Sequence, residues 1–170
     1  MNLAVGCGSQ RKGDPGWMTL DANPESGADF ICELPPFPEA VTRQLWNTVE
    51  MIHVLEHFYV WDAKGILKNI YELLSPSGVL VLEQPNLEFC ARVLLGQAKC
   101  PGRFDPEQCS MWGFYGDPNH RDPHMIHRWG YTPDSLRQLL VECGFDGEGI
   151  TQRRAKHHLR RRDFRLEVTK

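Results

Sequence analysis

The order of short apolar runs and amphipathic segments constrains the fold of this chain more than any other feature. Four short runs, which we predict to be strands, precede an amphipathic segment at residues 62–74, and a fifth follows it at residues 79–85. Strands that alternate with helices form largely parallel sheets with helices on both faces. The chain is therefore predicted to be an α/β protein. The predicted strands are residues 3–5, 17–21, 28–31, 48–52, 79–85, 148–152 and 164–169.

Two segments carry strong helix patterns. Residues 62–74 place isoleucines and leucines at helical spacing and end at the turn sequence SPSG, residues 75–78. The segment 132–145 starts with Thr132 at the N-cap and has Gly144 just past its end. Both segments are long enough to cover one face of a sheet.

Length and composition set the broad class. The 170 residues fit one domain over residues 1–170, and 41% hydrophobic with 24% charged residues is ordinary for a globular protein. No run approaches the roughly 18 apolar residues of a membrane span, and the N-terminus shows no signal-peptide pattern. We expect a cytoplasmic protein without a membrane span. Its six cysteines form no C-x-x-C pair, so we expect reduced thiols rather than a zinc ribbon.

A glycine-rich turn follows the first predicted strand, in the sequence NLAVGCGS at residues 2–9. Gly6 and Gly8 let the backbone turn tightly and approach a ligand, although structural turns use the same pattern. Asp21 ends the second predicted strand, where an acid accepts hydrogen bonds from a ribose diol or caps a turn. The next stretch, SQRKGDPGW, looks like a loop without the third glycine of dinucleotide sites, so a ligand without a pyrophosphate fits better.

Polar residues also end the fourth predicted strand, in the sequence MIHVLEHF at residues 51–58. His53, Glu56 and His57 would face a site at the carboxyl end of the sheet, or would cap a helix at the surface. The spacing of the two histidines also occurs in metal sites on helices. Because the glutamate directly precedes the second histidine and no third ligand is evident, we expect no metal.

Together these stretches resemble class I S-adenosylmethionine-dependent methyltransferases, and look most like the methyltransferase type 11 branch often found with glycan-biosynthesis enzymes. NLAVGCGS is similar to the first motif of that family, TLD to the acid after the second strand, and CELPPFP to the segment after the third. IHVLEHF, LLSPSGVLVLEQPN and HRWGYTPDSLRQLLVECGF resemble later segments. The resemblance implies a three-layer Rossmann-like methyltransferase fold, with a mostly parallel sheet and a C-terminal antiparallel hairpin.

The resemblance also implies which residues bind S-adenosylmethionine. The expected cofactor-binding residues are Gly6, Cys7 and Gly8 at the methionine part, Asp21 at the ribose with Ala22 next to it, Glu33 and Leu34 at the adenine, and His53 and Val54 beside the sulfonium.

Two features depart from the family pattern. Ala4 stands where the first motif usually has a polar residue. The family usually has an N-terminal helix that helps to cover the cofactor, whereas this chain begins at its first strand. We therefore expect an open site, or one closed by a second copy or another protein.

The acceptor side is less defined. A sulfonium already activates the methyl group, so positioning is the main requirement, but a hydroxyl acceptor also needs a base. His57, Glu56 and His124 are the candidate catalytic residues, and His120 and His127 lie in the same loop sequence as His124.

An insertion at about residues 86–131 would form the acceptor-binding element. It opens with a candidate short helix at 87–96, and we expect residues 98–131 to be a long ordered loop. One methionine and four aromatic residues of this insertion form either an aromatic wall for a sugar or base, or a small core of the loop. They are Met111, Trp112, Phe114, Tyr115 and Trp129.

The basic turn within residues 153–165 carries seven Lys or Arg and one acid. It favours a small anionic acceptor, such as a nucleotide-sugar or lipid-linked glycan, unless it is simply a solvated hairpin turn. Three other functions stay open: a non-catalytic cofactor-binding or scaffold subunit that needs a partner, a nucleic-acid methyltransferase, and a nicotinamide-dependent oxidoreductase.

Overall fold

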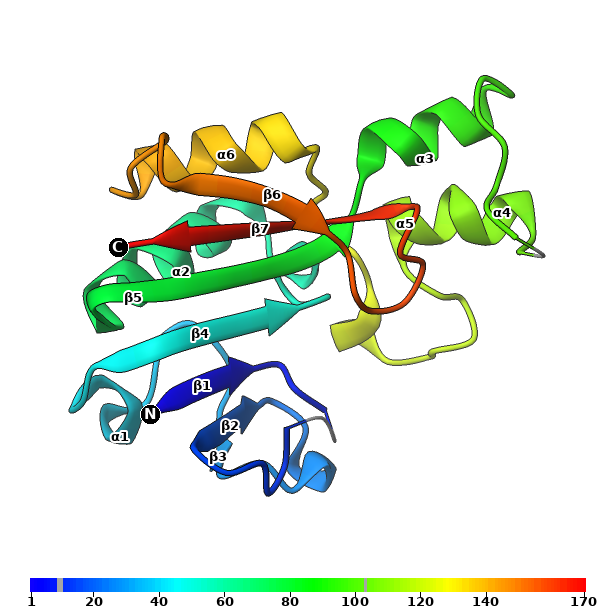
Figure 1. The fold of residues 1–170 in the computed structure, drawn as a ribbon. Helices are drawn as coiled ribbons and strands as arrows, with labels where there is room; N and C mark the ends of the chain where they lie inside the picture. Colours follow the sequence, from blue (N-terminus) through cyan, green and yellow to red (C-terminus); the bar gives the residue numbers. More distant parts are fainter. Residues whose placement is uncertain (9–10, 103) are drawn as a thin grey trace.

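Seven strands form one sheet in the order β3-β2-β1-β4-β5-β7-β6 (Figure 1). The structure, a computed structural model, describes residues 1–8, 11–102 and 104–170. The strands are β1 (Asn2–Val5), β2 (Trp17–Asp21), β3 (Phe30–Ile31), β4 (Trp46–Ile52), β5 (Leu74–Pro85), β6 (Ile150–Arg154) and β7 (Asp163–Thr169). The helices are α1 (Glu39–Thr42), α2 (Val60–Leu73), α3 (Leu87–Leu94), α4 (Pro106–Cys109), α5 (Met111–Tyr115) and α6 (Pro133–Glu142), with 3₁₀ turns η1 (Pro24–Ser26), η2 (Leu55–His57) and η3 (Pro123–Met125).

The strand directions confirm the predicted fold class. Strands β1 to β5 run parallel to their neighbours, whereas β7 runs antiparallel to both β5 and β6. β6 is therefore parallel to β5, and its carboxyl end lies at the same edge of the sheet as those of the other parallel strands. The strand order reverses between β1 and β4, which is where α/β sheets bind ligands.

One face of the sheet carries the hydrophobic core. Leu3 and Val5 of β1, Met51 of β4 and Leu82 of β5 are at most 2% exposed and belong to a single apolar cluster. The same cluster includes Val41 of α1, five residues of α2, three leucines of α6 and Ile150 of β6, at positions that follow helical or strand spacing. Figure 1 shows α2 and α6 behind the sheet, where they cover this face.

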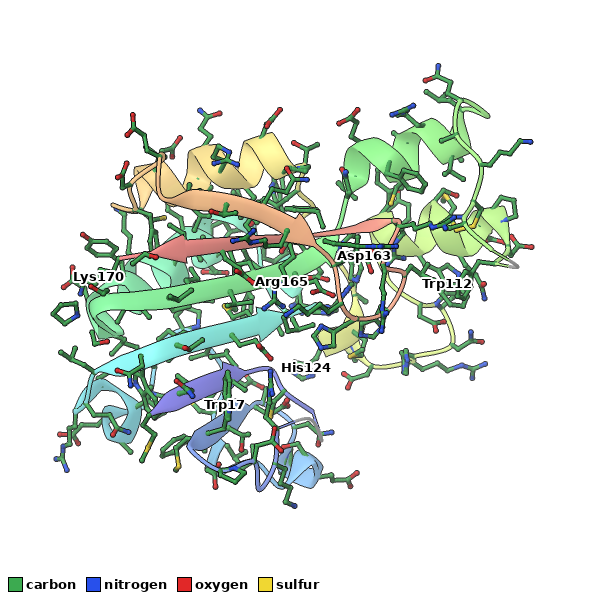
Figure 2. All side chains as sticks on the ribbon, in the orientation of Figure 1. Trp17, Trp112, His124, Asp163, Arg165 and Lys170 are labelled. Carbon is green, nitrogen blue, oxygen red and sulfur yellow. A yellow bond between two sulfur atoms is a disulfide. The ribbon has the colours of Figure 1, made fainter. Side chains whose placement is uncertain are left out.

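The opposite face is polar and is held by ion pairs. Arg11 donates two hydrogen bonds to the carboxylate of Glu50, at 3.2 and 3.1 Å. Arg165, labelled near the middle of the sheet in Figure 2, contacts Glu83 at 3.4 Å and Glu167 at 2.7 Å. The helices of the core therefore gather on the other face.

Residues 11–16, which connect β1 to β2, form turns, as predicted from the sequence. Ser9 and Gln10, in the same predicted loop, lie outside the described residues.

Several predicted boundaries change. β5 begins at Leu74 instead of residue 79 because residues 75–78 bulge out between the pairs Trp46–Leu74 and Thr48–Val79. The segment 98–131, expected to be a loop, contains α4, α5 and η3. These helices are too short to show a period in the sequence, and α4 is fixed locally by a capping box between Asp105 and Gln108.

The cysteine prediction is wrong for one pair. Cys100 and Cys109 form a disulfide, with Cα atoms 5.8 Å apart, because the chain turns between them into the capped start of α4. Cys7, Cys32, Cys90 and Cys143 are free thiols. No helix within the described residues combines the length and apolar character that a membrane span requires.

The N-terminus of α6 is capped by the side chain of Thr132, and the stabilising effect of this cap can be tested by substitution. Thr132 and Ser135 form the reciprocal hydrogen bonds of a capping box at this end. Replacing Thr132 by alanine is expected to lower the free energy of unfolding by about 1 kcal/mol, because it leaves a helix N–H without its acceptor. Urea unfolding would measure the loss. Gln138→Ala, on the exposed side of the same helix, is the control and is expected to stay within about 0.5 kcal/mol; equal losses in both variants would contradict the capping role.

Candidate functional site

A cavity of about 1200 Å³ lies at the carboxyl ends of the parallel strands. Its floor comes from β1, β2 and β4, and its outer wall comes from residues between 104 and 128 and from the β6–β7 turn. In Figure 2, Trp112, His124 and Asp163 lie toward this end of the sheet. All nine residues predicted to bind the cofactor line the cavity: Gly6, Cys7, Gly8, Asp21, Ala22, Glu33, Leu34, His53 and Val54.

The glycine turn forms a cradle that a larger residue would fill. Gly6 and Gly8 have φ angles of 62° and 54°, which L-residues with side chains rarely adopt. A Cβ on Gly6 would lie 2.5 Å from the Cγ2 of Val54. The turn is fixed by hydrogen bonds from the Gly6 N–H to the Leu20 carbonyl and from the Gly8 N–H to the Asp21 carboxylate, both 2.7 Å. The turn is thus held in one conformation at the floor of the cavity.

Asp21 is positioned to bind a diol. One carboxylate oxygen accepts from the Gly8 N–H at 2.7 Å and the other from the Asn23 N–H at 2.8 Å. Each carboxylate oxygen has a second lone pair, so the group keeps acceptor capacity for two hydroxyls. The donor set and the cradle fit a nucleoside ligand with a flexible polar tail.

The departure at Ala4 has a structural counterpart. Ala4 is buried in β1 and lies opposite Glu50 of β4 in the sheet register. Glu50 is itself paired with Arg11, so its carboxylate is charge-compensated below the glycine turn. The first motif therefore lacks its own acidic side chain, and the nearest acid in the sheet already has a partner.

His53 joins two buried carboxylates. It has a φ of 54°, and its ring nitrogens lie 3.2 Å from Glu56 and 3.2 Å from Asp163. Burial by itself would lower the pKa of His53, but Asp163 and Glu56 outweigh this effect and raise the pKa to about 9. Burial would likewise raise the pKa of Glu56, yet the contact with His53 lowers the pKa to about 2. His53 and Glu56 thus form an ion pair at the edge of the cavity, and Asp163 lies on the other ring nitrogen of His53.

The rings of His57 and His127 lie side by side close to this ion pair. Their ring centroids are 5.0 Å apart, and both side chains line the cavity. The Arg128 N–H and the Trp129 N–H donate to the Glu56 carbonyl, at 2.8 and 3.2 Å, which brings His127 beside His57 from 70 residues away in sequence. The sequence analysis named His127 without choosing it, because nothing in the sequence reports this loop-to-turn pairing.

The third catalytic candidate lies apart from the first two. His124 is 59% exposed at the mouth of the cavity, where it contacts Asp122 at 3.0 Å and Glu33 at 3.4 Å. Glu56, in contrast, is 1% exposed and lies below the cavity surface. The structure therefore brings Glu56 and His57 together and keeps His124 at the rim.

The acceptor side contains fewer of the expected groups. Of the five residues predicted to form an aromatic wall, Trp112 lines the cavity. Phe104, which was not predicted from the sequence, also lines the cavity. Tyr115 and Trp129 are 65% and 48% exposed and are not among the lining residues.

The basic turn reaches the cavity through His158, Leu159 and Arg162. Arg162 is 7% exposed and is paired with Asp163 at 2.5 Å, and it also donates to the Gln108 carbonyl at 3.3 Å. Its charge is therefore largely compensated. Arg160 and Arg161 are exposed and are not among the lining residues, so the cationic cluster expected at the acceptor is reduced to a single guanidinium from this turn.

Comparison with known proteins identifies the family. The sequence profile of a methyltransferase-domain family matches residues 15–148, so the chain belongs to that family. A comparison with curated protein sequences gives no significant match.

Solved structures share the fold at low sequence identity. An S-adenosylmethionine-dependent methyltransferase from Archaeoglobus fulgidus superposes with a TM-score of 0.61 at 14% identity, over 99% of this chain and 85% of that one. One from Mesorhizobium loti gives 0.60 at 13% identity, over 99% and 90%. The N-methyltransferase NodS from Bradyrhizobium japonicum, in complex with S-adenosyl-L-homocysteine, gives 0.57 at 13% identity, over 99% and 76%.

The chain is thus a class I methyltransferase domain with the Rossmann-like fold predicted from its sequence. Its cofactor is S-adenosylmethionine, which the glycine cradle and Asp21 fit. This result sets aside the nicotinamide-dependent and non-catalytic alternatives.

Proposed function

We propose that this domain transfers a methyl group from S-adenosylmethionine to a hydroxyl oxygen of a small polar acceptor. The observation that carries the proposal is one cavity of about 1200 Å³ that is lined both by the cofactor motifs and by the inserted segment. Pockets for one drug-sized ligand span roughly 300–1000 Å³. The cavity is therefore large enough for the cofactor and an acceptor side by side.

The cofactor half is assigned to the nine predicted residues. The Gly6–Gly8 backbone would hold the methionine part, Asp21 would accept from the ribose hydroxyls with Ala22 beside it, and Glu33 with Leu34 would border the adenine. Val54, packed against Gly6, and His53 would limit the space near the sulfonium. The protonated state of His53 suits a structural role here, because a cation would repel the positive sulfur if it pointed directly at it.

The reacting groups then need little from the protein beyond alignment and a proton acceptor. When bound, S-adenosylmethionine supplies a methyl group on a sulfonium whose sulfur becomes a neutral thioether as the methyl leaves. We propose that His57 accepts the proton of the acceptor hydroxyl as the new C–O bond forms. Its Nδ1 already faces the Ile126 carbonyl at 3.2 Å, which leaves Nε2 for this task.

The acceptor half favours a sugar-like molecule with an anionic group. Arg128 lines the cavity as a cationic side chain, and Trp112 with Phe104 offers ring surfaces to a sugar. Arg128 is fixed in place because its guanidinium donates to the carbonyls of His57 and Pro123. His124 would contact the acceptor at the mouth of the cavity and take no part in proton transfer. Nucleotide-sugars and phosphorylated sugars combine these features.

The test is an acceptor panel with matched members. Purified protein and S-adenosylmethionine would be incubated with nucleotide-sugars, sugar phosphates, their neutral sugars and amino sugars, and S-adenosyl-L-homocysteine would be measured by mass spectrometry. We expect turnover with phosphate-bearing hydroxyl acceptors and at least about tenfold less with their neutral counterparts, the range of one charged hydrogen bond. Methylation of an acceptor nitrogen, or equal turnover of neutral and anionic partners, would overturn the acceptor assignment.

Replacing His57 by glutamine probes the proton acceptor. With the best acceptor of the panel, kcat is expected to fall roughly 100-fold or more, because glutamine keeps the polar contacts but accepts no proton. S-adenosylmethionine affinity, measured by calorimetry, should remain unchanged. An unaltered kcat in His57→Gln would show that another group, or water, takes the proton. His120→Ala, at the exposed end of the cavity, is the control for surface histidines.

A further inference from the structure

We propose that Glu56, His57 and His127 form a binding site for one divalent first-row transition ion of the Zn²⁺ type. From the sequence we expect no metal, because Glu56 directly precedes His57 in the His53–His57 spacing and no third ligand is evident. The structure supplies that ligand from a distant loop. One potential ligand atom from each of Glu56, His57 and His127 lies within 4.8 Å of the other two.

Both imidazoles have a backbone carbonyl as the partner of one ring nitrogen, as metal-binding histidines commonly do. The Nδ1 of His57 lies 3.2 Å from the Ile126 carbonyl, and the Nδ1 of His127 lies 3.0 Å from the Gly113 carbonyl. A carbonyl can only accept, so each Nδ1 carries the proton and each Nε2 presents a lone pair. A backbone carbonyl on the far ring nitrogen is the usual support of a histidine ligand.

Glu56 supplies an anionic oxygen that lacks hydrogen bonds. The residue is 1% exposed, and neither carboxylate oxygen has a hydrogen-bond partner among the described residues. The ion pair with His53 occupies one side of the carboxylate, through Oε1 at 3.2 Å. Because an ionised carboxylate is costly to bury without partners, the free oxygen marks a place where a cation would be stabilised.

The ligand set selects the kind of ion. Two neutral imidazoles and one carboxylate match Zn²⁺ and similar transition ions, whereas Mg²⁺ and Ca²⁺ prefer oxygen ligands. An ion about 2.0–2.2 Å from each ligand would hold the ligand atoms about 3.3 Å apart. Ligand atoms now up to 4.8 Å apart would therefore approach one another by up to about 1.5 Å. His57 and His127 line the cavity, so the remaining coordination positions would face the acceptor.

Binding of an ion at this site does not depend on the identity of the acceptor, but it is an alternative to the proton-accepting role of His57 proposed above. With an ion bound, the His57 nitrogen would be a ligand instead of a proton acceptor. The positive charge would then favour loss of the acceptor proton to solvent water. Metal binding is therefore measured on its own, without acceptor and without turnover.

The experiment is a titration of the full chain after chelator treatment. ZnCl₂, CoCl₂ and MgCl₂ would be titrated separately by calorimetry, and Co²⁺ would also be followed by its visible absorption, which reports low-coordinate nitrogen and oxygen ligation. We expect one Zn²⁺ or Co²⁺ per chain and at least tenfold weaker binding of Mg²⁺. His57→Gln and His127→Gln should each weaken Zn²⁺ binding roughly 100-fold or more, since even supporting partners change affinity 10–100-fold.

His120→Ala is the matched control, because this histidine lines the same cavity at 57% exposure but lies outside the cluster. It should bind Zn²⁺ as the unmodified chain does. Circular dichroism and S-adenosylmethionine binding would confirm that each variant is folded. If one of the two variants, His57→Gln or His127→Gln, does not fold, the Zn²⁺ affinity of the other is enough to test the site. Absence of binding, or Zn²⁺ affinity unchanged in the folded variants, would overturn the site. Acceptor turnover by the chelated protein would leave the methyl-transfer proposal intact in that case.

Discussion

Replacing Asp21 by alanine is expected to weaken S-adenosylmethionine binding roughly 100-fold. Two hydrogen bonds from ribose hydroxyls to an ionised carboxylate contribute together about 3 kcal/mol, which corresponds to that factor. The same substitution also removes the acceptor that holds the Gly8 and Asn23 N–H groups, so the cradle itself loosens. Calorimetry with S-adenosylmethionine would measure the change.

The matched variants separate the two contributions. Asp21→Asn keeps one carbonyl acceptor and is expected to lose about tenfold, between the unmodified chain and Asp21→Ala. Glu25→Ala, in the exposed turn η1, should bind as the unmodified chain does. If Asp21→Ala binds the cofactor normally, the ribose lies elsewhere in the cavity and the assignment of the cofactor half must be abandoned.

Replacing His53 by alanine is expected to lower the free energy of unfolding by roughly 3–5 kcal/mol. The imidazole lies between Glu56 and Asp163, whose carboxylates are both buried. Removing it leaves Glu56 as a buried charge without its cationic partner, and such losses fall in this range. For a chain of this size the melting temperature would drop by roughly 10 °C. Urea unfolding and thermal melting would measure both values.

A second substitution identifies the cause of that loss. In an Asp163→Asn background one of the two charges is already gone, so His53→Ala should cost less than it does in the unmodified chain. His120→Ala, exposed and 4.0 Å from Asp117, should change stability by less than about 0.5 kcal/mol. An additive double variant would show that the pairing of His53 with Asp163 contributes nothing to the loss.

The sequence predicted the features that depend on local pattern. Strand β2 was placed at its observed bounds, and Thr132 was identified as the cap of α6. The spacing of motifs along the chain located every proposed cofactor residue at one cavity, because the carboxyl ends of parallel strands meet at one edge of the sheet. The spacing of apolar residues in helices and strands, and the order of motifs along the chain, can be read directly from a single sequence.

The remaining features depend on contacts between distant segments. His127 reaches His57 only because the loop backbone after it binds the Glu56 carbonyl. Arg162 is part of a visible basic run, yet its pairing with Asp163 removes the charge that the run suggested. Cys100 and Cys109 pair through a turn that carries no C-x-x-C pattern. Composition shows that such groups exist, but their partners are set by tertiary geometry.

The attachment of the outer wall has an evolutionary consequence. The inserted segment is anchored to the fourth-strand motif through a few bonds, chiefly from the backbone of Arg128 and Trp129 and from the Arg128 guanidinium. The methyl-donor half depends on β1, β2 and the turns that follow them. If this segment binds the acceptor as proposed, sequence drift between residues 98 and 126 is expected to change which molecules are modified while the donor site stays in place.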